Sequence, residues 1–280
     1  MSGGPRIDLH THSSCSDGAL RPAELVDQAA AAGIEVLALT DHDTLAGLEE
    51  AGRSAATRGL RLVPGVEVSA QWRAQSIHVL GLWIDPESPL LRRALDEQAD
   101  RRRQRMQRIC AQLTRSGLPG AALLAAVEAR PGLPTRAHLA EAMVAAGLIS
   151  RTDDAFRKYL GRGKAGHLAA VWPDLATVVG WIVAAGGCAS LAHPARYTLS
   201  AGARRRLFTD FRAAGGAALE VITGGNAPHQ VEGCAQAAIV FGLQGSIGSD
   251  FHNPQMTWNP LGRLAKLPDG VTPVWRGRGL

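Results

Sequence analysis

Seven short apolar runs, separated by helix-like stretches, constrain the fold of this chain more than any other feature of its sequence. The runs are rich in the branched and aliphatic residues typical of buried strands. Helix-like segments at residues 22–32 and 45–58 end at Gly33 and Gly59, the residue type that most often closes a helix. Because strands alternate with helices, the pattern predicts an α/β fold with a parallel sheet or barrel. The runs cover residues 7–9, 36–40, 62–68, 77–84, 188–192, 219–222 and 243–247.

The alternation stops between Pro89 and Pro173, where strand-like runs vanish and alanine, leucine and arginine dominate. We therefore predict a barrel formed by residues 1–88 and 174–280, interrupted by a small helical domain at residues 89–173 that covers the substrate. Apolar residues in its first helix recur at steps of three and four, which places Arg102 on an otherwise apolar stripe. That stripe contains Leu91, Leu95, Arg102, Met106, Ile109 and Leu113.

Further arginines surround this stripe, and we interpret them as a solvated helix face, with a nucleic-acid contact surface as the alternative. They are Arg101, Arg103, Arg105 and Arg108. The formal net charge of +5 at pH 7 comes almost wholly from arginine. Because guanidinium groups bind phosphate through paired hydrogen bonds, the excess is compatible with an anionic substrate, although genome base composition can produce the same bias.

The cysteines indicate a reducing compartment. They are far apart and form no CxxC pair, which argues against a zinc knuckle and against a secreted disulfide scaffold. The first residues lack the apolar segment of a signal peptide, and glycines interrupt the uncharged stretch 175–192. We therefore expect a cytoplasmic protein that does not enter a membrane, and nothing indicates an obligate protein partner. The cysteines are Cys15, Cys110, Cys188 and Cys234.

Histidines and acids gather on or directly after the predicted strands. In His10-Thr11-His12, two imidazoles on one side of a strand could reach one metal, although such a pair also occurs in cores and caps. Asp17 could merely cap the next helix. Glu67 lies within an apolar strand, where an unpaired carboxylate would cost several kcal/mol, so it requires a cation. The other members of this set are Asp41, His42, Asp43, His78, His193, Asp250 and His252.

Taken together, these positions are a much stronger signal than any one of them. In parallel α/β barrels the carboxyl ends of the strands form the active site, so distant positions would converge there. Mixed imidazole and carboxylate ligands suit zinc, manganese or iron better than calcium or magnesium. So many ligands would serve two or three divalent metal ions that share a bridging carboxylate, an arrangement that activates water for attack on a phosphoryl group.

The motifs resemble the polymerase and histidinol phosphatase (PHP) family. The likeness is closest to stand-alone members that remove phosphate from nucleoside 3',5'-bisphosphates and trim RNA from the 5' end. It implies a distorted (β/α)7 barrel with an inserted small helical domain. The residues that carry it are Asp8-Leu9-His10-Thr11-His12, Ser16-Asp17-Gly18, Thr40-Asp41-His42-Asp43, Pro64-Gly65-Val66-Glu67, His78-Val79-Leu80-Gly81, Ala192-His193-Pro194 and Gly248-Ser249-Asp250-Phe251-His252.

The resemblance also implies a role for each ligand. Glu67 would bridge a first and a second metal, and a hydroxide between these metals would attack the phosphorus. The first metal would be held by His10, His12, Glu67 and Asp250, the second by Glu67, His78 and His193, and the third by Asp17, His42 and His252. We expect Asp41 and Asp43 to orient ligand side chains such as an imidazole.

Basic residues of the helical segment are the candidates for binding the rest of the substrate. Pro134-Thr135-Arg136-Ala137-His138 resembles a segment of the bisphosphate-cleaving branch, which implies that Arg136 and His138 hold the phosphate that is not cleaved. The alternative is a helix start with ordinary surface contacts. Arg102, and Lys164 in Gly161-Arg162-Gly163-Lys164, are further candidates, although that turn is no P-loop. His167 and His229 are interpreted as ordinary residues.

We therefore expect a metal-dependent phosphatase of nucleoside 3',5'-bisphosphates that also trims short 5'-phosphorylated RNA. One alternative is a histidinol-phosphate phosphatase, but the arginine-rich insertion favours a larger, doubly phosphorylated substrate. The other is a non-catalytic PHP module with a structural or interaction role. The complete set of ligands argues against it, although fold alone does not establish function.

Overall fold

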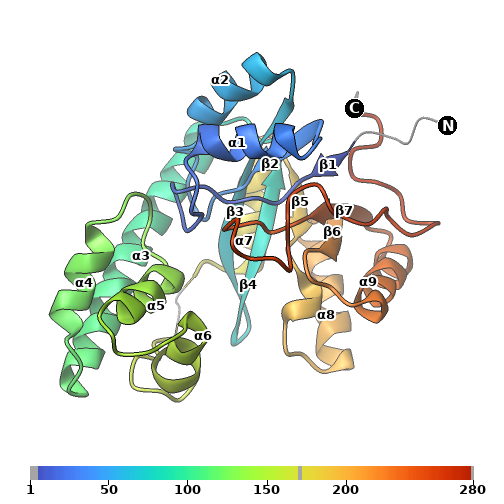
Figure 1. Ribbon diagram of the computed structural model, residues 1–280. Coiled ribbons are helices and arrows are strands. Elements are labelled where there is room, and N and C mark those ends of the chain that lie inside the picture. The colour runs from blue at the N-terminus through green and yellow to red at the C-terminus, as the bar shows by residue number, and fades with distance from the viewer. Residues whose placement is uncertain (1–5, 170–171, 279–280) are drawn as a thin grey trace.

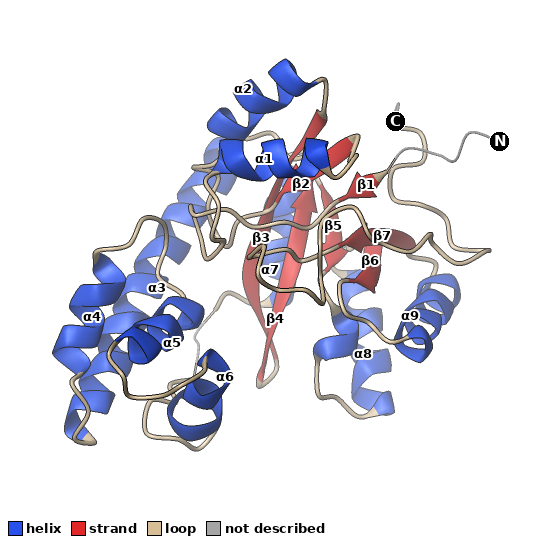
Figure 2. Cartoon of the chain, in the orientation of Figure 1, coloured by secondary structure: helices blue, strands red, loops and turns tan. Residues whose placement is uncertain are grey.

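The seven predicted strands form one sheet in the computed structural model, which describes residues 6–169 and 172–278 (Figures 1 and 2). The strands follow one another in chain order across the sheet. Beyond β1, the Leu9 N–H donates to the Ile247 carbonyl at 3.0 Å and the Asp250 N–H donates to the His10 carbonyl at 2.8 Å, so the sheet is nearly closed. The predicted distorted barrel is confirmed. Its strands are β1 (Ile7–Asp8), β2 (Val36–Leu39), β3 (Arg61–Trp72), β4 (Gln75–Leu82), β5 (Cys188–Leu191), β6 (Ala218–Thr223) and β7 (Gln244–Gly248).

The direction of one strand differs from the predicted parallel sheet. β4 is antiparallel to both β3 and β5, whereas the other neighbouring strands are parallel. In a fully parallel barrel, His78 near the start of β4 would lie at the end opposite to the other ligands. The antiparallel register pairs His78 with Ser69 in the second half of β3. The reversal therefore brings His78 to the end of the barrel where the parallel strands finish.

Five helices pack outside the barrel, where their apolar faces share one core with the strands. They begin and end at the expected signals: α1 has proline at its first position, and α2 ends at Gly59, whose φ of 65° favours glycine. In Figure 1, α1 and α2 lie beside β1–β3, and α8 and α9 lie beside β6 and β7. These helices are α1 (Pro22–Ala31), α2 (Leu48–Arg58), α7 (Leu175–Ala184), α8 (Ala201–Ala213) and α9 (Pro228–Phe241).

The chain between β4 and α7 is helical, as the sequence predicts, and it has a second apolar core. Its long first helix α3 belongs to both cores, because Leu91 and Leu95 pack in the barrel core while Met106 and Leu113 pack in the second. The division at residues 89 and 173 therefore stays a prediction. The elements are α3 (Pro89–Arg115), α4 (Gly120–Glu128), α5 (Arg136–Ala145), α6 (Thr152–Ala155) and the π-helix η1 (Phe156–Leu160). Within the described ranges, no helix is long and apolar enough to cross a lipid bilayer.

Candidate metal centre

The structure brings all of the predicted ligands together at one end of the barrel. They come from segments far apart in the chain, and nearly all of them are buried or half-buried. They are His10, His12 and Asp17 after β1, His42 after β2, Glu67 within β3, His78 within β4, His193 after β5, and Asp250 and His252 after β7.

Glu67 lies at the centre of this cluster and is only 1% exposed. Its Oε1 lies 2.9 Å from His193 Nε2 and 3.0 Å from His78 Nδ1. Its Oε2 lies 3.3 Å from His12 Nε2 and 3.4 Å from His10 Nε2. The two oxygens of one carboxylate thus face two different groups of imidazoles, which is the geometry required of a ligand that bridges two cations.

A first group of ligand atoms converges where Asp250 meets the two imidazoles after β1. Asp250 Oδ1 lies 3.3 Å from His10 Nε2 and 3.2 Å from His12 Nε2, and these two nitrogens are 3.1 Å apart. Two imidazole nitrogens that face each other across 3.1 Å need a proton or a cation between them. Glu67 Oε2 is buried as well, and it also lies 2.9 Å from His42 Nδ1. A bound cation would satisfy all four atoms.

Another group surrounds Asp17. Its Oδ1 lies 3.3 Å from His252 Nε2 and 3.8 Å from His42 Nε2. This oxygen is also buried. The ligand atoms of Asp17, His42, His252 and His12 all lie within 4.8 Å of one another, the spacing of a metal site.

The electrostatics of the cluster favour cations. Burial opposes ionisation of Glu67, yet the imidazoles of His42, His78 and His10 hold the pKa of its carboxyl well below the usual range. Burial lowers the pKa of His12 to about 3, so this imidazole is neutral and its lone pair is available to a metal. Burial likewise opposes the charged form of His252, but Asp17 and Asp250 raise the pKa of His252 to about 10. A metal would replace that proton.

Glu220 supports two of the ligands, and the sequence analysis missed it. It is fully buried in β6, its Oε1 lies 2.9 Å from His10 Nδ1, and its Oε2 accepts from the His193 backbone N–H at 2.6 Å. With the proton on Nδ1, His10 presents the lone pair of Nε2 to the cluster. The signal was present in the sequence, because Glu220, like Glu67, is a lone acid within an apolar strand.

The turn after β5 supplies two more supporting side chains that were not predicted. Arg196 donates hydrogen bonds to Asp250 and, at 3.1 Å, to the Gly224 carbonyl. The Tyr197 hydroxyl accepts from the backbone N–H of His78 at 2.8 Å. Arg196 thus holds Asp250 in place, and Tyr197 holds the segment that carries His78, although neither residue is itself a predicted ligand.

Asp41 and Asp43, which were expected to orient ligand side chains such as an imidazole, contact other groups. Asp41 accepts from the hydroxyls of Ser13 and Ser16, both at 2.6 Å, and so fixes the turn that carries Asp17. Asp43 accepts from Arg102 Nε at 2.6 Å and from the Ser69 N–H at 2.8 Å. Neither carboxylate is hydrogen-bonded to an imidazole within the described ranges. Arg102, predicted to bind substrate, is thus held by Asp43 and by Ser69 Oγ at 2.8 Å.

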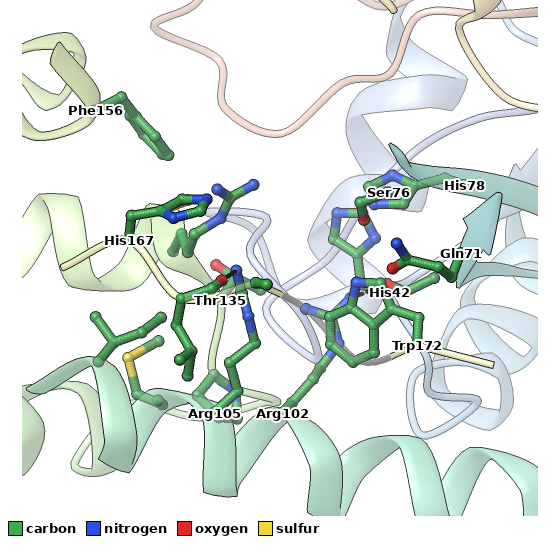
Figure 3. Close-up of a pocket in the computed structure, with 18 of the residues that line it drawn as sticks. His42, Gln71, Ser76, His78, Arg102, Arg105, Thr135, Phe156, His167 and Trp172 are labelled. Atoms are coloured by element: carbon green, nitrogen blue, oxygen red, sulfur yellow. Dashed lines mark hydrogen bonds between the residues drawn. The ribbon is translucent and has the colours of Figure 1, made fainter. Parts of the chain in front are cut away.

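A cavity of about 690 Å³ separates the metal cluster from the helical segment (Figure 3). His42 and His78 line it on the barrel side. On the helical side, α3 contributes Arg102 and Arg105, and the start of α5 contributes Arg136. Cavities of this size bind nucleotide-sized ligands, and this one joins a cationic wall to a metal-binding wall.

Two of these guanidinium groups lack a carboxylate partner among the described residues. Arg105 donates from Nη2 to the Leu168 carbonyl at 3.0 Å, but its buried Nε has no partner. Burial, together with Arg136 and Arg102, lowers the pKa of Arg105 to about 10. Burial and Arg102 also lower the pKa of Arg136. Like charges held together in a half-buried wall indicate a binding site for an anion.

The helical segment departs from several expectations. The prediction that Arg105 lies on a solvated face is wrong, because Arg105 lines the cavity. It follows Arg102 by three residues on α3, so the two side chains lie on the same side of the helix. Lys164 is exposed, and the lining residue of its turn is Arg162 instead. His138 is buried beside the start of α5, where its Nδ1 accepts from the Thr135 N–H at 3.3 Å. His167, interpreted as an ordinary residue, lines the cavity.

Comparison with known proteins finds a matching family model and similar sequences. The model of the PHP domain family matches residues 8–132. A 5'-3' exoribonuclease from Haemophilus influenzae is 43% identical over 274 residues, which cover 96% of this chain and 98% of the relative. A 3',5'-nucleoside bisphosphate phosphatase from Chromobacterium violaceum is 41% identical over 271 residues, which cover 96% of this chain and 95% of the relative.

Solved structures agree with these relatives. An amidohydrolase from Chromobacterium violaceum superposes with a TM-score of 0.91 at 40% identity, covering 97% of this chain and 95% of that one. A protein from Bifidobacterium adolescentis, described as a metal-dependent phosphoesterase, gives a TM-score of 0.81 at 28% identity and covers 99% of this chain and 96% of that one. The similarity therefore extends over the barrel and the helical segment together.

Proposed function

The chain belongs to the PHP domain family, and we propose that it is a metal-dependent phosphoesterase that removes the 3'-phosphate from nucleoside 3',5'-bisphosphates. The observation that carries this proposal is the pairing of two walls in one cavity. One wall is a cluster of imidazoles and carboxylates suited to divalent metals, and the other holds Arg105 and Arg136, which have no carboxylate partner among the residues that the structure describes. A substrate with two phosphates would meet both walls at once.

We further propose that the cluster takes two to three divalent ions of manganese, zinc or iron. The donor set mixes imidazole nitrogens with carboxylate oxygens, which these metals prefer. Glu67 faces two groups of ligands with its two oxygens, and Asp17 lies in a separate group. When bound, such ions activate water and neutralise the oxygens of a phosphoryl group. The assignment of individual ligands to individual ions stays a prediction.

The residues of the chain would then position the substrate. Arg136 and Arg105 would hold the phosphate that is not cleaved, which fixes the distance between it and the phosphate at the metal cluster. Arg102 would act mainly through its bonds to Asp43 and Ser69, which connect α3 to the barrel. Product would leave as the 5'-monophosphate and inorganic phosphate.

A second activity, trimming of 5'-phosphorylated RNA from its 5' end, fits the same site. The relative from Haemophilus influenzae is named a 5'-3' exoribonuclease. A terminal 5'-phosphate could occupy the arginine wall while the next phosphodiester lies at the metal cluster. Histidinol phosphate fits less well, because its ammonium and imidazole groups would face Arg105 and Arg136. A non-catalytic role would leave the paired walls without a purpose.

The substrate proposal is tested by comparing kcat/KM under one metal condition. We expect adenosine 3',5'-bisphosphate to exceed adenosine 3'-monophosphate by about 10- to 100-fold, since one charge-assisted phosphate contact contributes roughly 1.5–3 kcal/mol. Histidinol phosphate should be slower than both. A preference for histidinol phosphate would refute the proposal, and equal rates on the bisphosphate and the monophosphate would remove the arginine wall from it.

Arg136→Ala tests the arginine wall directly. We expect kcat/KM for adenosine 3',5'-bisphosphate to fall by about 10- to 100-fold, while turnover of p-nitrophenyl phosphate changes little, because only the nucleotide has a second phosphate to hold. Arg108→Ala is the matched control, because Arg108 is exposed on α3. Equal losses on both substrates would show that Arg136 supports the fold and does not bind the substrate.

A further inference from the structure

Among the rings that line the cavity, Phe156 and His167 come from the π-helix η1 and the turn that follows it. Phe156 begins the π-helix η1, and His167 follows it after a short turn. Figure 3 shows both rings on the side of the cavity opposite to His42 and His78. The arginine wall and the metal cluster account for the phosphates of the proposed substrate, but neither accounts for these rings.

Phe156 is exposed although it is large and apolar. The residue is 37% exposed, whereas Leu160 and Tyr159 of the same π-helix pack with the second apolar core, to which Phe156 does not belong. The guanidinium carbon of Arg136 lies 5.7 Å from the centre of the Phe156 ring. A large apolar side chain that lines a cavity and belongs to neither apolar core is available to a ligand.

The local backbone holds this ring in place. The Gly161 N–H donates to the Phe156 carbonyl at 2.8 Å and so closes the π-turn. A Cβ atom at residue 161 would lie 2.4 Å from that carbonyl oxygen, so the close approach requires glycine. Single π-turns of this kind are frequent at functional sites. The glycine-rich turn that resembles a phosphate loop in sequence thus has another use, which is to fix Phe156.

The same turn returns the chain to place His167 at the cavity. The Gly166 N–H donates to the Tyr159 carbonyl at 2.8 Å, and the His167 N–H donates to the Lys164 carbonyl at 2.9 Å. The imidazole has no hydrogen bond or ion pair among the described residues, and no ring contact joins it to Phe156. The two rings therefore do not stack on each other, and both line the cavity.

We propose that Phe156 and His167 form a subsite for the nucleobase, which stacks on these rings while the phosphates occupy the arginines and the metal cluster. This inference rests on the proposed function. Guanidinium groups and metals satisfy phosphates, whereas a flat, largely apolar base needs a flat, apolar partner. Because purines offer a larger face, the subsite would favour purine over pyrimidine bisphosphates.

The test compares adenosine 3',5'-bisphosphate with its abasic analogue, which keeps both phosphates and lacks the base. In the wild type, we expect the nucleotide to have the higher kcat/KM. Phe156→Leu should lower kcat/KM about tenfold on the nucleotide, mainly through KM, and leave the abasic analogue unchanged, as expected for the loss of one stacking contact. Phe156→Tyr, which keeps a flat ring, should restore most of the loss.

His167 is tested in the same way. We expect His167→Leu to lose the preference for the nucleotide over its abasic analogue, and His167→Phe to keep that preference. Equal losses on both substrates would overturn the base subsite, because they would mean that Phe156 only steers Arg136. A leucine variant without any loss would overturn it as well. If wild-type protein hydrolysed the nucleotide and its abasic analogue equally, the base subsite would be overturned, but the proposed phosphatase activity would still hold. Wild-type protein that hydrolyses neither would overturn the proposed function itself, and this inference with it.

Discussion

Glu67→Gln is expected to lower kcat for phosphate release by about 1000-fold or more. The loss of one charge-stabilising donor from an active site typically costs 10²–10³-fold, and Glu67 serves two groups of imidazoles at once. Glutamine has nearly the same shape, so the change removes the charge without opening a cavity. It also leaves a weak amide where two cations need a shared carboxylate. We therefore expect the variant to retain fewer metal ions as well.

The measurement combines single-turnover kinetics with metal analysis of the same preparation. His229→Ala is the matched control, because His229 is exposed on α9 and belongs neither to the ligand cluster nor to the cavity lining, and it should retain full activity and metal content. A thermal melt shows whether each variant is folded. If Glu67→Gln kept its metals and more than about a tenth of the wild-type rate, the bridging role would be refuted.

The positions of the seven strands could be predicted because burial of a strand leaves a local pattern in the sequence. The direction of β4 could not, since direction depends on the turn that precedes the strand. That turn includes Arg73, whose φ of 53° is one that glycine or asparagine usually adopts. Without such a residue, the sequence carries no hairpin signal. The end of β3 was not predicted either. The strand runs four residues beyond its predicted limit at residue 68, because the polar Ser69 and Gln71 interrupt the apolar run.

The members of the candidate metal centre were visible because imidazoles and carboxylates are rare at the ends of buried strands. Glu220 gave the same signal as Glu67 but matched none of the quoted motifs, and it was overlooked. Arg105 and Phe156 are different. Their place at the cavity depends on how the helical segment packs over the barrel, and neither periodicity nor residue type distinguishes them from residues on a solvated face.

Removal of the metals is expected to abolish phosphate release. A strong chelator should leave less than about a thousandth of the activity, because the described side chains at the centre are suited to hold cations and the proposed nucleophile is a metal-activated water. The apolar cores do not depend on the metals, so the secondary structure should persist. Adding manganese back after dialysis should restore the rate. Full activity in protein whose lack of metal has been checked by elemental analysis would refute the proposed mechanism.

As the pH falls, proton competition should weaken binding of the ion at Asp17, His42 and His252 more than binding of the ion beside His78. Without metal, burial opposes the charge on His252, but Asp17 and Asp250 raise its pKa to about 10, so it is protonated at pH 7 and must lose that proton to bind a metal. Carboxylates also raise the pKa of His42. At the second predicted ion, by contrast, burial lowers the pKa of His78, so this imidazole is already free of a proton.

Affinity for the third ion should therefore fall at least about tenfold for each pH unit below 8, whereas affinity for the ion beside His78 should change less. Equilibrium dialysis against manganese at pH 6, 7 and 8 measures both. Asp17→Asn should remove the ion at Asp17, His42 and His252 and leave the others bound. Asp27→Asn is the matched control, because Asp27 pairs with Arg58 at the surface. Metal content that does not depend on pH, or that is the same in Asp17→Asn and the wild type, would contradict a third ion at this position.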